Sequence, residues 1–338
     1  MPIQPSEIRW YKSQLTSDAI SAQNGGRLSA IESVSNVKNN IFPDVPQAER
    51  QTGSSRFRKL FIKVDNATDV ALLSPKVFIE SGSTGDDYVV LWPGSQTDVQ
   101  SAIAGSRCYG FGTLSSSVSQ GATLLFVTAE HAGYASRQPF RAGDTIRISN
   151  QADVNSPGQV EYAVIQGINY TGADMEIILT TGLTYPWNTA AGTVKVASCL
   201  LPGDLKGTVS GLLAISASGG GFTETNIMVH SIGAIEQVWT LTITDEVTGS
   251  FRLDGDTLGA SVANGTVGAD FAAINPDTAS PYFTLQSLGW SGVWQNGNTL
   301  TFTIHPAAAP IWYERVVPPG AQALGSDVFV VAIDGDSA

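Results

Sequence analysis

The chain has 338 residues, of which only 14% are charged, and its 18 basic and 30 acidic residues give a formal net charge of −12. A protein that binds nucleic acid mainly through the phosphates needs the opposite sign, at least locally, so this balance argues against direct nucleic-acid binding. The 35 glycines and the low charge are typical of short strands joined by many turns, which excludes a mainly helical chain.

Cysteine content and hydropathy argue against a disulfide framework, a signal peptide and a membrane span. Cys108 and Cys199 are too few for a disulfide framework, so we expect two buried thiols, with one bridge between them as the open alternative. The first residues show no basic segment followed by an apolar core, and no apolar run approaches the about 18 residues of a membrane span. We therefore expect a soluble chain, made in a cytoplasm, with no membrane partner.

The N-terminal part, residues 1–55, is predicted to be one short strand followed by an extended arm. Residues 6–13 have the composition of a strand, whereas residues 14–55 are polar, with sparse and aperiodic hydrophobic side chains. Compact domains rarely contain so long an irregular segment. We consider two alternatives: the arm lies over the following domain, or a neighbouring subunit orders it.

Residues 57–115 have the pattern of an antiparallel β unit. Leu60, Ile62 and Val64 alternate with polar side chains, residues 77–79 form a second short apolar run, and residues 65–69 are rich in turn formers. Strand, turn and strand at such close spacing favour a β-sandwich.

Residues 116–202 are predicted to be a separate, smaller β module. Short apolar runs recur at residues 124–128, 145–149, 161–166, 176–180 and 193–197. This many strands in so short a segment favour a small barrel or roll.

Residues 203–338 return to the sandwich pattern. Trp239, Leu241 and Ile243 alternate with threonines, and residues 328–333 are apolar on both faces, which predicts a central strand. We therefore predict an all-β chain. Its domains would be a discontinuous antiparallel β-sandwich from residues 56–115 plus 203–338, the inserted barrel-like module at 116–202, and extended N- and C-terminal arms.

The segment from Pro281 to Gly320 contains the strongest local signals. The turn at residues 295–298 is followed by a strand in which Leu300, Phe302 and Ile304 share one face. Prolines then recur at positions 306, 310, 318 and 319, and we expect them to stop further pairing. The part after residue 305 would then be an aromatic-rich arm.

Two segments carry a resemblance to a known class of proteins. The run from Pro281 through GWSGVWQNGNTLTFT to APIWYERVVPPGA resembles structural proteins of tailed-phage virions. So does FRKLFIKVDNATDVALLSPKVFIE at residues 57–80, with the motif NNIFPDV at residues 39–45 before it. The resemblance covers about a fifth of the chain and implies a particle component.

The sequence shows no recognisable catalytic or metal-binding motif. There is no Gly-x-Ser-x-Gly motif. His131, His230 and His305 are far apart in the sequence, and no carboxylate lies at the spacing of a catalytic or metal-binding motif, so we expect each to be structural. The glycine-rich run at residues 216–221 lacks the ending of a phosphate loop. The acidic turns at residues 254–256 and 334–336 do not match an EF-hand. We expect no cofactor, no metal and no enzymatic activity.

Aromatic side chains are the remaining candidates for a functional site. They could pack in a core, anchor a partner subunit, or stack on sugar rings. The subunit-interface hypothesis names five residues: Trp10, Trp290, Trp294, Trp312 and Tyr313.

These observations lead to one expected function and two alternatives. We expect a structural subunit of a bacteriophage virion, part of a ring or collar at the head–tail junction (the neck) or in the tail. Its partners would be copies of itself and portal, connector, tail or capsid proteins. The first alternative is a capsid decoration protein or a baseplate, receptor-binding component that binds carbohydrate. The second is a glycoside hydrolase, because a pair of catalytic carboxylates leaves no linear signature.

Overall fold

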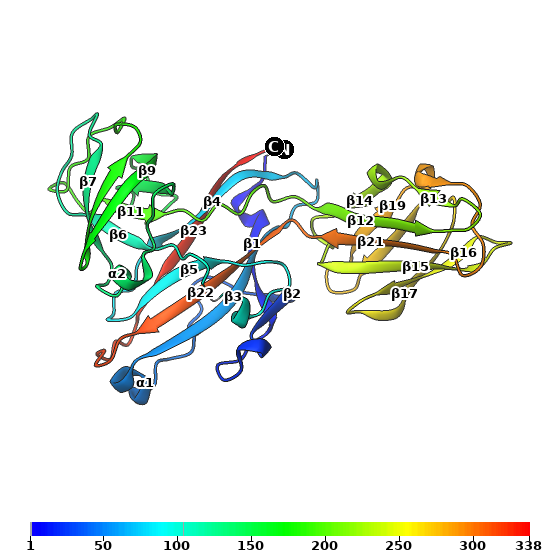
Figure 1. Cartoon of the computed structure of the whole chain (residues 1–338), viewed down its shortest axis with the longest axis horizontal. Coiled ribbons are helices and arrows are strands. Elements are labelled where there is room, and N and C mark those ends of the chain that lie inside the picture. Colours follow the sequence, from blue (N-terminus) through cyan, green and yellow to red (C-terminus); the bar gives the residue numbers. More distant parts are fainter. Residues whose placement is uncertain (1, 104) are drawn as a thin grey trace.

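The computed structural model describes residues 2–103 and 105–338 (Figure 1). Strands take 48% of the residues and helices 7%, which confirms the all-β prediction. The sheets are antiparallel, and they divide into a central unit, a closed barrel and a β-sandwich. Among the described residues, no helix combines the length and the apolar character that a membrane crossing requires.

The central unit is a five-stranded sheet with a two-stranded ribbon packed on one face. The sheet order is β2-β1-β3-β22-β5, and the ribbon is β4-β23. The bounds are β1 Ile8–Leu15, β2 Gly25–Glu32, β3 Ser54–Val64, β4 Leu72–Ser81, β5 Tyr88–Pro93, β22 Ala308–Val317, β23 Val330–Ser337 and helix α1 Gln47–Thr52. Ile62 and Ile311 of the sheet share a core with Phe78 and Ile79 of the ribbon, and all four are at most 1% exposed.

The module predicted at 116–202 is a closed barrel with strand order β10-β7-β6-β11-β8-β9, so the barrel prediction is confirmed. Its elements are β6 Phe111–Leu114, β7 Leu124–Ala129, α2 Tyr134–Arg137, β8 Thr145–Ser149, β9 Val160–Thr171, β10 Asp174–Leu179 and β11 Lys195–Ser198. The barrel begins a few residues before the predicted boundary, because β6 closes it by pairing with β7 and β11. Leu114 faces the barrel core, whereas Phe111 belongs to the core of the central unit.

Residues 208–305 form a sandwich of their own, whereas the prediction was that residues 203–338 pack with residues 56–115 into one discontinuous sandwich. One sheet has the order β12-β21-β15-β16-β17, the other β14-β19-β18, with a small ribbon β13-β20. The bounds are β12 Thr208–Ile215, β13 Gly221–Phe222, β14 Ile227–Val229, β15 Gln237–Asp245, β16 Ser250–Gly255, β17 Gly259–Thr266, β18 Phe271–Asn275, β19 Ser280–Leu285, β20 Trp290–Ser291 and β21 Thr299–His305. The alternating pattern identified the buried faces correctly. Those faces meet one another, because Trp239 and Phe302 pack edge-on against Phe283 and Leu241 belongs to the same core.

Strand β22 corrects the expectation of an aromatic arm after residue 305. It pairs with β3 on one side and β5 on the other, so it lies inside the sheet. Pro310 is tolerated because its carbonyl and its nitrogen face the side where β5 ends at Pro93. The Pro310 carbonyl accepts a hydrogen bond from Gly94 N at 3.2 Å, beyond that end.

Two further expectations about the terminal segments need correction. Residues 14–55 are not irregular throughout, because β2 pairs with β1, and α1 precedes β3. The last strand, β23, pairs with β4 and is not central: Val330 is 42% exposed, whereas Ala332 is buried. Burial along β23 does not alternate, because the pairing with β4 shifts between Val330 and Val331, and β23 belongs to a two-stranded ribbon with a partner strand on one side only.

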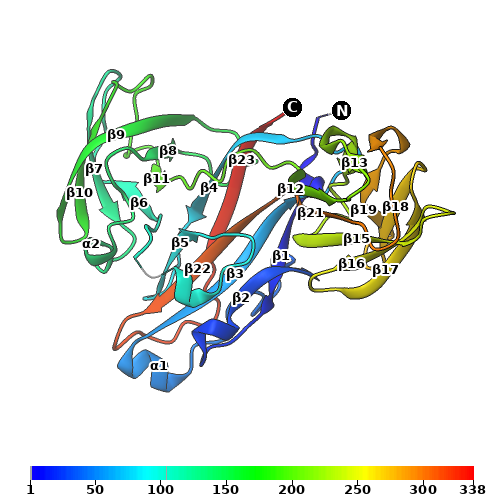
Figure 2. The ribbon, with the colours of Figure 1, turned by 45° about the vertical axis from the view of Figure 1, so that its right-hand side comes forward.

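The barrel and the sandwich are both inserted between two neighbouring strands of the central sheet, β5 and β22, and lie on opposite sides of the central unit (Figure 1). The two chain ends lie side by side in both views (Figures 1 and 2), with Ile3 N donating to Ser337 Oγ at 3.0 Å. The barrel is tied to β4 through Glu80, which accepts from Arg147 at 2.8 Å and from Lys195 at 2.9 Å.

The contact between the central unit and the sandwich is both polar and apolar. Arg27 and Asp256 form an ion pair at 2.6 Å, and Lys63 Nζ donates to the Ile232 carbonyl at 2.6 Å. A small apolar cluster, which includes Leu72 of β4, joins the connectors between the units.

Candidate functional site

The five predicted interface aromatics lie in three places: Trp312 on one face of the central sheet, Tyr313 and Trp10 together on the other face, and Trp290 with Trp294 in the sandwich. Trp312 and Tyr313 are neighbours in β22, so their side chains point to opposite faces of the central sheet. Trp312 is 0% exposed, and its Nε1 donates to Asp98 Oδ2 at 3.0 Å. Its ring lies so close to Gly25 that a Cβ there would come within 2.6 Å of it.

Trp290 and Trp294 lie together in the sandwich, far along the chain from Trp10. Their ring centroids are 5.5 Å apart, and Phe222 lies 4.9 Å from Trp290 in an edge-on arrangement. Trp294 is 5% exposed and donates to the Ser291 carbonyl.

Burial corrects the interface hypothesis for three of these residues. Trp312, Tyr313 and Trp294 have almost no surface to offer a partner in this conformation, because each is 5% exposed or less. Their packing agrees with the alternative of core aromatics. Trp10 and Trp290 are partly exposed, so their interface role stays a prediction.

Trp10 and Tyr313 border a cavity of about 950 Å³, here called the sheet cavity. Its floor is the face of the central sheet that carries Leu60, Val89 and Tyr313. Its walls are the 33–46 loop and the 318–329 loop, which precede α1 and β23.

Arg315 anchors the 33–46 loop to the floor of the sheet cavity. Its guanidinium lies 4.9 Å from the centroid of the Phe42 ring, and Nη1 donates to the Pro43 carbonyl at 2.8 Å. Phe42 also packs near Phe329, at 6.3 Å between ring centroids, so the two loops meet over the sheet. Sequence reasoning noted Phe42 only as part of the motif at residues 39–45 and missed Arg315.

Three carboxylates converge on the turn at residues 83–85, beside the sheet cavity. Ser83 Oγ lies 2.6 Å from an Asp87 oxygen and 2.7 Å from an Asp327 oxygen, so its single proton can be donated to either carboxylate, and Ser83 N donates to Glu130. Burial raises the pKa of Glu130 to about 7. Burial, together with a hydrogen bond that protonated Asp87 donates to the Asp327 carboxylate, raises the pKa of Asp87 to about 6. The cluster joins the barrel, the central unit and the 318–329 loop, which makes it a structural junction.

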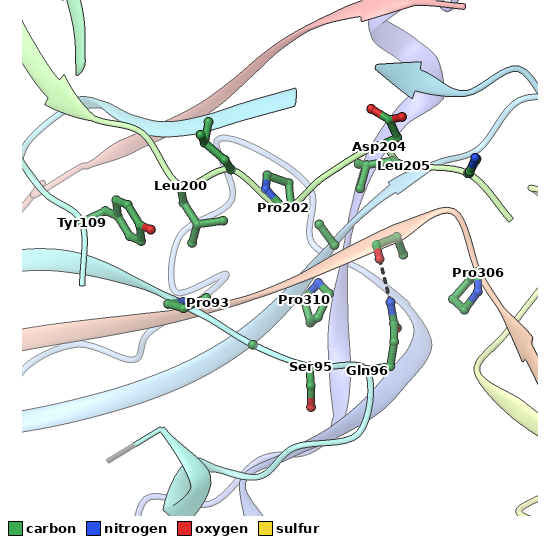
Figure 3. A pocket seen from close by; sticks show the side chains of 15 residues that line it. Pro93, Ser95, Gln96, Tyr109, Leu200, Pro202, Asp204, Leu205, Pro306 and Pro310 are labelled. Atoms are coloured by element: carbon green, nitrogen blue, oxygen red, sulfur yellow. Dashed lines mark hydrogen bonds between the residues drawn. The ribbon is translucent and has the colours of Figure 1, made fainter. Parts of the chain in front are cut away.

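A second cavity, of about 360 Å³, lies where the connectors between the units meet, and we call it the joint cavity (Figure 3). Proline, alanine and leucine side chains dominate its walls, with Pro93 and Pro310 across from Leu200 and Pro202 (Figure 3). Gln96 Nε2 donates to the Ala308 carbonyl at 2.7 Å. Few polar groups converge here, so the joint cavity has the character of a gap between packed connectors.

The three histidines lie apart, as the sequence suggested, but two of them have carboxylate and hydroxyl partners. His230 lies between Asp69 at 3.2 Å and Thr284 at 2.8 Å. His305 lies between Glu236 and Ser210, which are 69 and 95 residues away in the sequence. No spacing in the sequence signals these contacts, because strand pairing creates them.

Metal and thiol chemistry have no assembled site in the described part of the chain. No group of three or more His, Cys, Asp or Glu side chains there is placed to hold a metal ion. Cys108 and Cys199 are free and buried, and burial raises the pKa of both thiols to about 12.

Comparisons with known proteins yield no relative. No family model, curated protein or solved structure matches this chain.

Proposed function

We propose that this chain is a structural subunit of a larger assembly, in which it contacts copies of itself and other proteins through surfaces on all three β units. The resemblance of residues 57–80 and 281–321 to tailed-phage virion proteins suggests the particle. A ring or collar at the head–tail junction or in the tail is the position we favour. This role requires no catalysis and no cofactor.

The observation that carries the proposal is a group of exposed apolar side chains on each unit. On the barrel, Leu124 of β7 pairs directly with Ile178 of β10, and Phe126 follows on the same face of β7. These three side chains are 41%, 46% and 42% exposed. Neighbouring apolar side chains on a surface, unlike scattered ones, mark contacts with other molecules.

The sandwich has its own exposed group on an edge strand. Leu213 and Ile215 of β12 are 56% and 61% exposed, and β12 contains no charged residue and no proline that would block pairing with another chain. In the central unit, Ile31 of β2 and Val37 of the 33–46 loop are 61% and 55% exposed. Separate contact surfaces on one subunit are what a ring of repeated head-to-tail contacts requires.

The test is the assembly state of the full chain by mass photometry and sedimentation as concentration increases. We expect the chain to form a closed oligomer, and we expect the double variant Phe126→Lys, Ile178→Lys to reduce or abolish it. The matched control is Val247→Lys, because Val247 is 90% exposed on a turn and should leave assembly unchanged. A chain that stays monomeric at every concentration, with and without a particle lysate, would contradict the proposal.

Location within a particle needs a separate measurement. Density for this chain near the portal in a particle reconstruction would support the collar. Density on the icosahedral faces or at the tail tip would replace the collar with capsid decoration or the baseplate.

A further inference from the structure

Ser210, His305 and Glu236 lie in a row across three neighbouring strands of the sandwich. Ser210 is on β12, His305 is the last residue of β21, and Glu236 immediately precedes β15. Ser210 Oγ is 2.7 Å from His305 Nε2, and His305 Nδ1 is 2.8 Å from Glu236 Oε2. A hydroxyl within hydrogen-bond reach of a base, itself oriented by a third group, is the arrangement that activates a serine nucleophile.

Exposure to solvent increases along this row, from Glu236 through His305 to Ser210. Glu236 is 8% exposed, His305 is half-buried, and Ser210 is exposed. A buried carboxylate accepts the Nδ1 proton and fixes the imidazole tautomer, so that Nε2 keeps its lone pair for the Ser210 proton. The serine, which must meet a substrate, is the member in contact with solvent.

The backbone beside Ser210 departs from the regular ladder. The pairing of β12 with β21 shifts between Ser210 and Leu213, and Gly211 has a φ of +65°. β12 is also the edge of its sheet, so no further strand covers this segment. The bulge leaves Gly211 and Leu212, the two residues that follow Ser210, outside the regular pairing with β21. Backbone amides next to a nucleophile are the donors that oxyanion sites commonly use.

We propose that Ser210, His305 and Glu236 form a nucleophilic site that accepts acyl groups from small, unhindered esters. Ser210 Oγ attacks the carbonyl carbon and forms a new C–O bond while its proton moves to His305 Nε2. The bond to the leaving alcohol then breaks, and the alcohol departs with that proton. Water, deprotonated by His305, then attacks the acyl carbon. The bond from that carbon to Ser210 Oγ breaks as His305 returns the proton to Oγ, and the carboxylic acid is released, so water is the only further reactant.

The substrate class follows from the openness of the site. Ser210 lines neither the sheet cavity nor the joint cavity, so no wall of these cavities would enclose a substrate bound there. We therefore expect the site to accept an ester whose carbonyl group can reach the exposed serine, as that of a small, unhindered ester can. This inference goes beyond the proposed function and does not depend on it. It departs from two expectations of the sequence analysis, that His305 is structural and that the chain has no enzymatic activity.

The first experiment labels the full-length protein with a fluorophosphonate, a reagent that reacts covalently with activated serines. Peptide mapping by mass spectrometry should find one adduct, on Ser210, and Ser210→Ala should abolish it. Ser216→Ala is the matched control, because Ser216 lies in the same unit and bonds Asn298 instead of a histidine. An adduct that persists in Ser210→Ala, or no adduct in the folded wild type beside a labelled serine esterase, overturns the proposal.

The second experiment measures hydrolysis of p-nitrophenyl acetate. We expect His305→Gln to lower the rate about 100-fold, the scale of a lost general base. Glu236 is a positioning residue, so Glu236→Gln should lower labelling and turnover with an unchanged thermal unfolding temperature, and Glu236→Asp should restore part of both. Thr284→Val, at the similar His230 arrangement, should change neither. Equal rates in the wild type, His305→Gln and Ser210→Ala would overturn the assignment.

Discussion

Trp312 illustrates how one side chain can be read in two ways. Its place among prolines suggested an exposed anchor, yet it is buried between Gly25 and Asp98 behind the central sheet. Lys59 is buried beside it, and its ammonium lies 2.6 Å from the Asp98 carboxylate. The role of a single residue in this chain thus depends on the neighbours that the fold places beside it. The same holds for Glu130, whose pKa depends on its burial.

Glu130 should make stability depend on pH. Its pKa is raised to about 7 by burial, against an ordinary value of 4.5. Below pH 4.5 the carboxyl is protonated in both the folded and unfolded chain. As pH rises towards 7 the unfolded chain loses the proton first, so folding stability falls by up to about 3 kcal/mol.

The variant Glu130→Gln is neutral at every pH and should remove this loss. Its amide can still accept from Ser83 N and contact Tyr134, which bond Glu130 in the wild type. We expect unfolding temperatures of the variant and the wild type to be similar at pH 4.5, with the variant more stable at pH 8. Asp87 titrates nearby in both proteins, so the difference between them isolates Glu130. A difference that shrinks as pH rises would contradict the raised pKa.

Strands β12 and β21 explain how a whole sandwich can be inserted into another sheet. Thr208 at the start of β12 pairs with His305 at the end of β21, so the chain enters and leaves the sandwich at neighbouring positions. Its core draws on residues within 209–304. The barrel differs, because Tyr88 and Val90 of β5 pack in the barrel core.

Excised fragments should show this difference between the two inserted units. We expect residues 206–306 to fold alone and to unfold cooperatively, since their core is complete. A fragment of residues 108–200 should be markedly less stable, because it lacks the side chains of Tyr88 and Val90. Residues 86–200, which restore them, should recover a cooperative transition. Circular dichroism during urea unfolding provides the measurement, and a disordered 206–306 fragment would refute the expectation.

The arrangement of the three units depends on a few contacts at their junctions. The ion pair between Arg27 and Asp256 links β2 to the sandwich, and Asp69 Oδ1 accepts from Ser231 N at 2.6 Å. Glu80 links the ribbon to the barrel from the other side. The Arg27–Asp256 pair is partly exposed and therefore fixes orientation more than it stabilises either core, because such pairs contribute at most about 1 kcal/mol. The Glu80 pairs are buried, so removing one partner there would leave an uncompensated buried charge.

Replacing Arg27 should therefore loosen the molecule without unfolding it. In Arg27→Ala we expect a larger radius of gyration and maximum dimension by small-angle X-ray scattering, with an unfolding temperature within a few degrees of the wild type. Arg252→Ala is the control, because Arg252 pairs with Asp254 inside the sandwich and does not cross a junction. Identical scattering from the wild type and both variants would contradict this role of Arg27 and would show that the remaining contacts, Lys63 with Ile232, Asp69 with Ser231 and the apolar cluster, hold the sandwich in place.

The sequence by itself determined the class of fold and much of the local structure. Alternation over residues 239–243 and 299–305 predicted β15 and β21, and recurring short strands predicted the barrel. These patterns are local, since a strand with one buried face must repeat every second residue whatever covers it. Strand type and buried face could therefore be predicted without knowing any partner.

Only the tertiary structure decided which faces and strands meet. Periodicity does not say that Phe302 packs on Phe283, nor that β22 continues through Pro310 between β3 and β5. The row of Ser210, His305 and Glu236 likewise exists because β12, β21 and β15 are neighbours in one sheet. Pairing between strands distant in the chain is set by the summed burial and hydrogen bonding of the whole unit, and no single segment records that sum.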